Sequence, residues 1–71
     1  MVDIKKLCDE LYKDSKSSYQ TTTIYFTVVY ELEKKLTSEE FDEFVKISSA
    51  IACKQKENEG IFDISAQYNK D

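Results

Sequence analysis

Residues 21–36, TTTIYFTVVYELEKKL, contain the densest apolar run of the chain and restrict the possible folds more than any other stretch. If this segment forms a helix, Ile24, Phe26 and Tyr30 lie outside its main apolar stripe, so the first two turns are apolar on nearly every side. A helix with that pattern is contacted by more than one neighbour. The main stripe, with spacings of three and four residues, consists of Tyr25, Val28, Val29, Leu32 and Leu36.

The same segment also fits a β-strand, because every second residue from 24 to 32 is apolar. Its β-branched and aromatic residues favour that interpretation. A lone strand would need a partner, either residues 61–65 or the same strand of a second chain. The chain has no proline and one glycine, which leaves few sharp turns and disfavours an all-β fold. We therefore predict a helix, with an α+β fold that has a strand at residues 21–30 as the alternative.

The junction after this segment carries the clearest helix-start signal in the sequence. Thr37 and Glu40 have the spacing of a capping box, in which each side chain bonds the backbone N–H of the other residue. Leu36 and Phe41 are placed for the hydrophobic staple that accompanies such a box. The acidic residues that follow suit the positive end of a helix dipole, so a helix is predicted to begin at Ser38.

Residues 2–16 have the pattern of a surface helix, and Asp3 is placed to cap its N-terminus. Residues 15–23, SKSSYQTTT, are predicted to form a loop, because serine and threonine compete with helical backbone hydrogen bonds. Any residue from Ser18 to Thr22 could cap the next helix. Tyr19 lies in this loop, and we expect its ring to fold back on its own domain, with display on the surface as the alternative. The apolar stripe of the first helix consists of Ile4, Leu7, Cys8, Leu11 and Ser15, with Tyr12 at its edge.

The third helix is predicted to cover residues 38–58, with Gly60 ending it. Ser48 and Ala52 are small and lie in the middle of its apolar face, so a neighbouring helix can approach closely there. Residues 60–71 form a tail with several large apolar side chains, which we expect to pack over the bundle. These signals predict one all-α domain over residues 1–71, a small three-helix antiparallel bundle with helices at about 2–16, 21–36 and 38–58.

The residue types present argue against catalysis. The chain has no histidine, so a general base would have to be a carboxylate or a lysine with a shifted pKa. Its single glycine excludes the common phosphate-binding loops. The two cysteines, Cys8 and Cys53, match no zinc-binding pattern and are expected to be free thiols. We therefore predict a protein that is not an enzyme and that holds no metal or cofactor.

Charge restricts the partners further. The net charge is −4, with ten lysines and no arginine, which argues against nonspecific binding to nucleic acid and against docking on an anionic membrane. Residues 1–20 contain no apolar leader, and no stretch approaches the length of a membrane span, so a cytoplasmic protein is expected. The composition, rich in lysine, glutamate, isoleucine and tyrosine and free of arginine, suggests a low-GC bacterial source, or a phage or mobile element of such a host.

We predict from these features a small acidic protein-binding module, a regulator or inhibitor that occludes a partner protein with a basic surface. Residues 37–59 carry six acidic residues and three lysines, and therefore most of the excess negative charge. Aromatic residues outside the main stripe of residues 21–36 offer contact area for a partner or for a homodimer. The candidate partner-binding residues are Phe26, Tyr30, Glu39, Glu40, Asp42, Glu43 and Ile47.

The alternative function is that of a nucleic-acid-associated regulator acting as a dimer. Its contact surface would be an N-terminal lysine edge formed by Lys5, Lys6, Lys13 and Lys16. Lysine neutralises phosphate as a point charge but lacks the guanidinium fork that reads guanine, so sequence-specific recognition is disfavoured.

Overall fold

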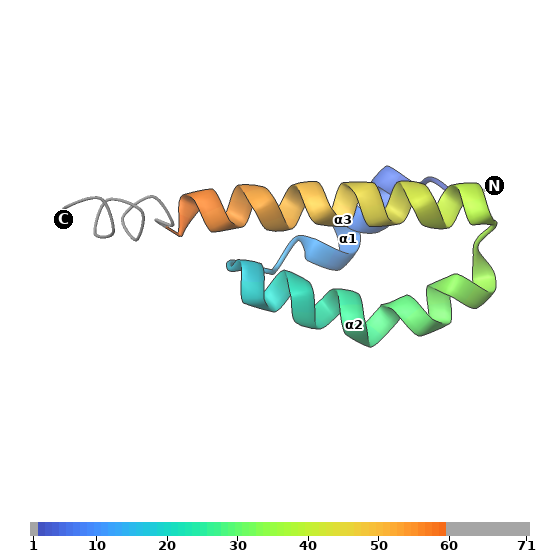
Figure 1. Cartoon of the computed structure of the whole chain (residues 1–71), viewed down its shortest axis with the longest axis horizontal. Coiled ribbons are helices and arrows are strands. Elements are labelled where there is room, and N and C mark those ends of the chain that lie inside the picture. The colour runs from blue at the N-terminus through green and yellow to red at the C-terminus, as the bar shows by residue number, and fades with distance from the viewer. Residues whose placement is uncertain (1, 60–71) are drawn as a thin grey trace, which may run out of the picture.

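Three helices make up the part of the chain that the computed structural model describes, residues 2–59 (Figure 1). They are α1 (Ile4–Tyr12), α2 (Ser18–Lys35) and α3 (Ser38–Asn58). The helices α2 and α3 run antiparallel, and α1 packs against both. Residues 2–59 contain no strand, so the predicted all-α bundle is confirmed and the alternative strand at residues 21–30 is wrong. The expected packing of the tail, residues 60–71, concerns residues outside the described range.

The first helix begins at Ile4, two residues after the predicted start, and it ends earlier than predicted. The backbone N–H of Lys6 donates to Asp3 Oδ1 over 3.1 Å, which is the expected N-cap. The prediction extended this helix to residue 16, whereas α1 ends at Tyr12. The backbone N–H and the hydroxyl of Ser15 both donate to the Tyr12 carbonyl, at 3.0 and 2.9 Å. A serine that bonds the backbone in this way ends a helix rather than extends it.

The second helix begins at Ser18 rather than at residue 21. Its cap is Ser17, whose hydroxyl accepts the Gln20 backbone N–H over 3.1 Å. The Gln20 side chain in turn accepts the Ser17 backbone N–H over 3.1 Å and so completes a capping box. Tyr19 therefore lies in the first turn of α2 and not in a loop. The Ser-x-x-Gln spacing of this box was present in the sequence.

The third helix has the predicted start and end, Ser38 and Asn58. The Thr37 hydroxyl accepts the Glu40 backbone N–H over 3.1 Å, and Glu40 Oε1 accepts the Thr37 backbone N–H over 3.0 Å. The predicted capping box is thus confirmed. Leu36 and Phe41, the two staple residues, are both half-buried against the core.

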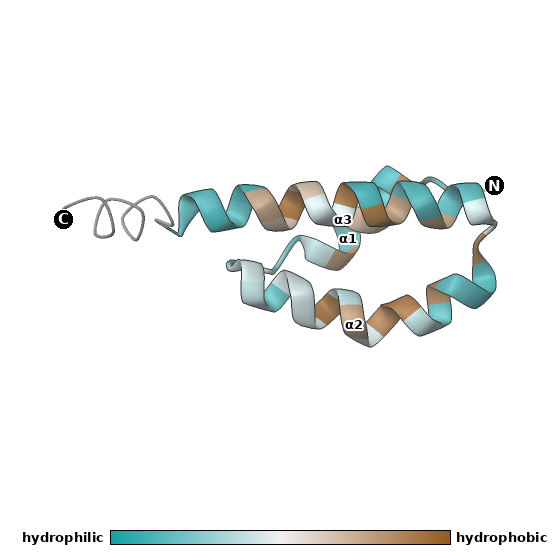
Figure 2. Cartoon of the chain, viewed as in Figure 1, coloured by the Kyte–Doolittle hydropathy of each residue, from teal (hydrophilic) through white to brown (hydrophobic). Residues whose placement is uncertain are grey.

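The core is small and centred on Phe44, whose side chain is fully buried. The Tyr25 ring stacks on Phe44 with 5.8 Å between ring centroids. Ile24, which the helical pattern places outside the main stripe of its segment, packs against the core because α2 contacts both α1 and α3. Figure 2 shows the apolar residues gathered in the middle of α2 and α3, with polar residues at the helix ends. The buried apolar residues are Ile4, Cys8, Tyr12 and Phe44.

Five polar side chains join the three helices, and we call them the polar seam: Tyr12, Ser15, Thr21, Ser48 and Gln55. The hydroxyls of Tyr12 and Ser48 lie 2.9 Å apart and connect α1 to α3. The Thr21 hydroxyl bonds Ser15 Oγ at 3.0 Å and the Gln55 side chain. Gln55 Nε2 donates to the carbonyl and to the hydroxyl of Ser15, at 3.2 and 3.0 Å. Within residues 2–59, no buried side-chain nitrogen or oxygen lacks a hydrogen-bond partner.

The Tyr12–Ser48 bond gives a testable prediction about stability. The Ser48→Ala substitution leaves the buried Tyr12 hydroxyl without this partner, so the free energy of unfolding should fall by about 1–3 kcal/mol. Adding Tyr12→Phe removes the second polar group as well, and the double variant should recover most of that loss. Urea unfolding of the wild type, of Ser48→Ala, of Tyr12→Phe and of the double variant measures the coupling between the two positions. Single effects that simply add in the double variant would contradict a stabilising role for the bond.

Candidate protein-binding surface

Three large aromatic side chains lie exposed along one face of α2, and we call them the aromatic stripe: Tyr19, Phe26 and Tyr30. Their exposed fractions are 79%, 70% and 64%. They are seven and four residues apart, and these spacings keep side chains on the same side of a helix. Single exposed apolar residues are common on protein surfaces, whereas a continuous row of them is typical of an interaction site.

The core and a neighbouring lysine hold two members of this stripe in place. The Phe26 ring meets the Tyr25 ring edge to face, with 5.5 Å between centroids and 74° between planes. Because Tyr25 is itself stacked on the buried Phe44, the exposed Phe26 ring is in contact with a residue fixed by the core. Lys34 Nζ lies 4.0 Å from the centroid of the Tyr30 ring, in cation–π contact. A partner would therefore meet side chains that are already partly ordered, which lowers the entropy cost of binding.

The threonines beside the stripe offer a partner few hydrogen-bond donors. The Thr23 hydroxyl donates to the Tyr19 carbonyl over 3.0 Å, and the Thr27 hydroxyl donates to the Thr23 carbonyl over 2.8 Å. Both donors are used within the helix, and both threonines present a methyl group as well as an oxygen. This face of α2 is therefore better suited to apolar contact than its threonine content suggests.

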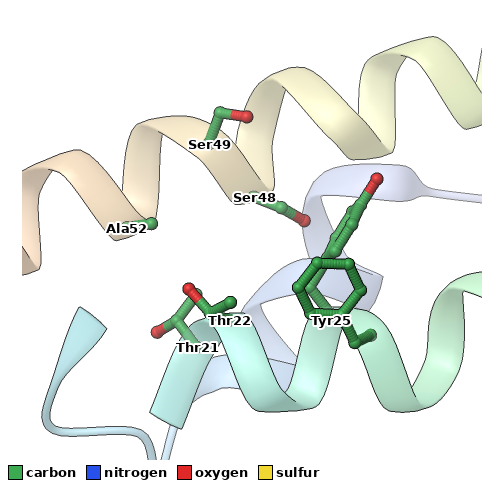
Figure 3. Close-up of a pocket in the computed structure, with 7 residues that line it drawn as sticks. Thr21, Thr22, Tyr25, Ser48, Ser49 and Ala52 are labelled. Atoms are coloured by element: carbon green, nitrogen blue, oxygen red, sulfur yellow. The ribbon is translucent and has the colours of Figure 1, made fainter. Parts of the chain in front are cut away.

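A cavity of about 140 Å³ opens beside the stripe, between α2 and α3 (Figure 3). Its walls are aromatic rings, methyl groups and hydroxyls, and they include no carboxylate, amine or thiol. Cavities of about 150 Å³ hold a benzene ring, so this one is large enough for a single apolar side chain. The lining residues are Thr21, Thr22, Tyr25 and Phe26 from α2, and Ser48, Ser49 and Ala52 from α3.

The acidic residues predicted to bind a partner lie elsewhere, at the start of α3. Glu39, Glu40 and Glu43 surround a surface depression together with Val2 and Thr37. The pKa of the Glu40 carboxyl is lowered, chiefly by the Thr37 backbone N–H and further by the Val2 backbone N–H, which donates to Glu40 Oε2 over 3.3 Å. The charge of Glu40 is thus already used to hold the N-terminus of α3 and residue 2 together.

The structure divides the predicted partner-binding residues between separate places. Phe26 and Tyr30 belong to the aromatic stripe, whereas three of the four acidic residues surround the depression. Asp42 is exposed on α3 outside that depression. Ile47 is half-buried and packs against the core, so it is not part of an exposed surface. The expectation that Tyr19 folds back on its own domain is wrong, because Tyr19 is the most exposed aromatic residue of the stripe.

Other candidate sites are weaker. The lysines of the N-terminal edge are all exposed, but Lys13 Nζ forms an ion pair with Glu10 at 3.5 Å. Both cysteines are free; burial raises the pKa of the Cys8 thiol, and Cys53 is exposed. Among residues 2–59, no three ligating side chains gather in a way that could hold a metal ion. No helix in the described part of the chain is long and apolar enough to cross a membrane.

Comparison of the chain with models of known protein families, with curated proteins and with solved structures gives no match. Inferences about function therefore depend on the geometry described above. The aromatic stripe, the adjoining cavity and the acidic depression are the three surface features from which a function can be argued.

Glu40 gives a prediction about pH. Its pKa is lower in the folded chain than the usual 4.5, so its contribution to stability is complete above that value and is lost as the pH falls through the folded-state pKa. The Glu40→Gln variant keeps an oxygen that can accept the capping hydrogen bond but cannot titrate. Its free energy of unfolding should therefore decline less on acidification than that of the wild type.

Urea unfolding at neutral pH and below pH 4.5 measures this difference. Glu39→Gln is the matched control, because it removes a charge from the same turn but no capping hydrogen bond. If Glu40→Gln declines as steeply as the wild type, the capping carboxylate does not contribute to the acid sensitivity of the fold.

Proposed function

We propose that this chain is a small non-enzymatic protein-binding module, a cytoplasmic regulator or inhibitor that acts by occluding a surface of another protein. The observation that carries the proposal is the exposed aromatic stripe on α2. Tyrosine and phenylalanine bury a large area at a low cost in conformational entropy, and aromatic residues therefore dominate the binding energy of many interfaces.

The fixed position of the stripe supports a binding role. Phe26 contacts Tyr25, which stacks on the fully buried Phe44, and Tyr30 is in cation–π contact with Lys34. The cavity next to Phe26 can receive a side chain of the partner, as the anchor pockets of interfaces do. Apolar contact area and a receiving pocket therefore lie side by side on α2 and α3.

The acidic depression supports a target with a basic surface. Glu39 and Glu43 are exposed, and the chain as a whole carries a net charge of −4. Charge of one sign attracts an oppositely charged partner over several ångströms and raises the rate of association. Val2, with an exposed fraction of 45%, adds an apolar contact at the edge of the same depression.

The make-up of the cavity supports a non-enzymatic role. Its lining contains threonine, serine and tyrosine hydroxyls but no group that acts as a general base near neutral pH. The chain has no histidine that a rearrangement could bring there. Binding is the use that these side chains support.

The proposal is tested by removing the aromatic rings of the stripe. A tagged full-length chain captures partners from a lysate of its native host, and the affinity for each captured protein is then measured for wild type and for Phe26→Ser/Tyr30→Ser. Loss of an aromatic anchor costs an interface about 2 kcal/mol or more, so the double variant should bind at least about 30-fold more weakly than the wild type. Circular dichroism should show that helicity is retained.

The matched control is Glu31→Ser/Lys35→Ser, which places the same new residue at two exposed positions of α2 outside the stripe. This variant should bind captured partners as the wild type does. The competing explanation is that residues 61–68 cover the stripe. A compact monomer whose Phe26→Ser/Tyr30→Ser variant loses helicity would favour that explanation and contradict the proposal.

A further inference from the structure

Charged residues of opposite sign lie at the two ends of the face that α2 and α3 form around the cavity. Phe26 and Ser49 line the cavity from α2 and α3. Seven residues make two helical turns, about 10.5 Å, and return a side chain to nearly the same face. Two turns from Phe26 toward the C-terminus of α2 lies Glu33, and two turns from Ser49 toward the N-terminus of α3 lies Asp42.

Because α2 and α3 are antiparallel, those two steps lead to the same end of the face (Figure 1). The opposite steps lead to Tyr19 on α2 and to Lys56 on α3, at the other end. Glu33, Asp42 and Lys56 are all exposed. We call this surface the α2/α3 face: Glu33 and Asp42 lie at one end, Phe26 in the middle, and Lys56 at the other end. Lys46 lies on α3 between Asp42 and Ser49, and the Glu59 carboxylate accepts hydrogen bonds from Ser18 at the Lys56 end. The cavity at its centre is lined by α2 and α3 alone and not by α1.

We propose that the α2/α3 face binds a second copy of the chain in an antiparallel arrangement, with a two-fold axis passing near Phe26 and Ser49. This arrangement sets each helix against the same helix of the other copy, so it brings Lys56 of each copy to Asp42 of the other, and Glu33 to Tyr19. The inference rests on the proposed function in taking the aromatic stripe to be a protein interface. It differs in the partner, because it assigns the stripe to a second copy and leaves the target protein to the acidic depression.

Charge complementarity favours a second copy over a different protein. A two-fold axis exchanges the ends of the face, so Asp42 at one end and Lys56 at the other become complementary to the same two residues of a second copy. A uniformly basic target would meet Lys56 with repulsion. The two Phe26 rings come together near the axis, with the charged pairs about 10.5 Å away on either side, which gives the apolar centre and polar rim of a stable interface.

The acidic depression is a separate surface in this arrangement. It is lined by Val2, Thr37, Glu39, Glu40 and Glu43, none of which lines the cavity at the two-fold axis. The dimer would therefore present two acidic depressions to basic target proteins. The aromatic stripe would serve self-association, and the acidic residues would serve recognition of the target.

The first test is a charge exchange, read by sedimentation of the full-length chain over a range of concentrations. Lys56→Glu places a like charge opposite Asp42 at both ends of the interface and should weaken dimerisation by about tenfold or more. Adding Asp42→Lys restores an opposite-charge pair and should recover most of the affinity. The matched control is Lys54→Glu, an exposed lysine of the same helix turn that lies outside the α2/α3 face; it should leave dimerisation unchanged.

The second test locates the axis. In a Cys53→Ser background, which removes the exposed native thiol, Ser49→Cys puts a new thiol close to the proposed axis. Oxidised glutathione should then link two copies through this position. Ala50→Cys is the control, because it is equally exposed and adjacent in sequence but lies on another side of α3. It should form the linked dimer much more slowly.

Three results would overturn the proposal: a monomer at every concentration, a charge exchange that restores nothing, or equal crosslinking of Ser49→Cys and Ala50→Cys.

A monomer is also the result expected if residues 60–71 cover the face. If a monomer still captures a host protein through Phe26 and Tyr30, the proposed function stands and the second copy is wrong. If the dimer forms as described but neither the stripe nor the depression binds another protein, the self-association is right and the proposed function is wrong.

Discussion

The hydrogen bond between Tyr12 and Ser48 joins α1 to α3 at the centre of the molecule, and the arrangement of the bundle depends on it and on the rest of the polar seam. A chain of 71 residues can bury only a small core, and here the fully buried apolar side chains are few. Apolar contacts alone tolerate sliding of one helix along another. Hydrogen bonds require particular distances and directions, so the buried hydroxyls and the Gln55 amide fix the register in which the three helices pack.

The aromatic face of α2 stays exposed because α1 covers only one side of the pair formed by α2 and α3. Ser15 ends α1 at Tyr12 and then bonds Thr21 and Gln55, so the chain turns into α2 at once. A nine-residue helix covers one side of the pair formed by α2, with 18 residues, and α3, with 21. The other side of the pair carries Phe26 and Tyr30 and has no third helix in the described residues.

Local signals in the sequence predicted the third helix fully and the first two in part. Thr37 and Glu40 bond each other's backbone N–H groups, as their spacing in the sequence predicts, so this spacing was sufficient to place the start of α3. In SKSSYQTTT, by contrast, several hydroxyl residues could act as cap or as loop. Ser15 was assigned to a helix because its partner Gln55 lies forty positions away in sequence and could not be inferred from spacing.

The candidate surface was predictable to the same degree. Periodicity separated Phe26 and Tyr30 from the main stripe of their segment, and both are exposed. It treated Ile24 and Ile47 in the same way, although both pack against the core. A helical pattern defines which residues share a face but not where a third helix lies, and the position of α1 decides which flanking residues are covered. The Tyr19 position became clear only with the Ser17 cap, which extends α2 by one turn and brings that ring into line with Phe26.

The acidic turn of α3 has two roles that compete for the same charges. Negative side chains at a helix N-terminus stabilise the helix through its dipole, and Glu40 also accepts backbone hydrogen bonds from Thr37 and Val2. A carboxylate engaged in this way has less to gain from a lysine or arginine of a partner, because binding would have to replace bonds already made. In the proposed function, attraction of a basic target would therefore come mainly from Glu39 and Glu43, while Glu40 keeps residue 2 and the start of α3 in position beside them. The fold thus separates, within one helical turn, the carboxylate that maintains the structure from those that remain available for recognition.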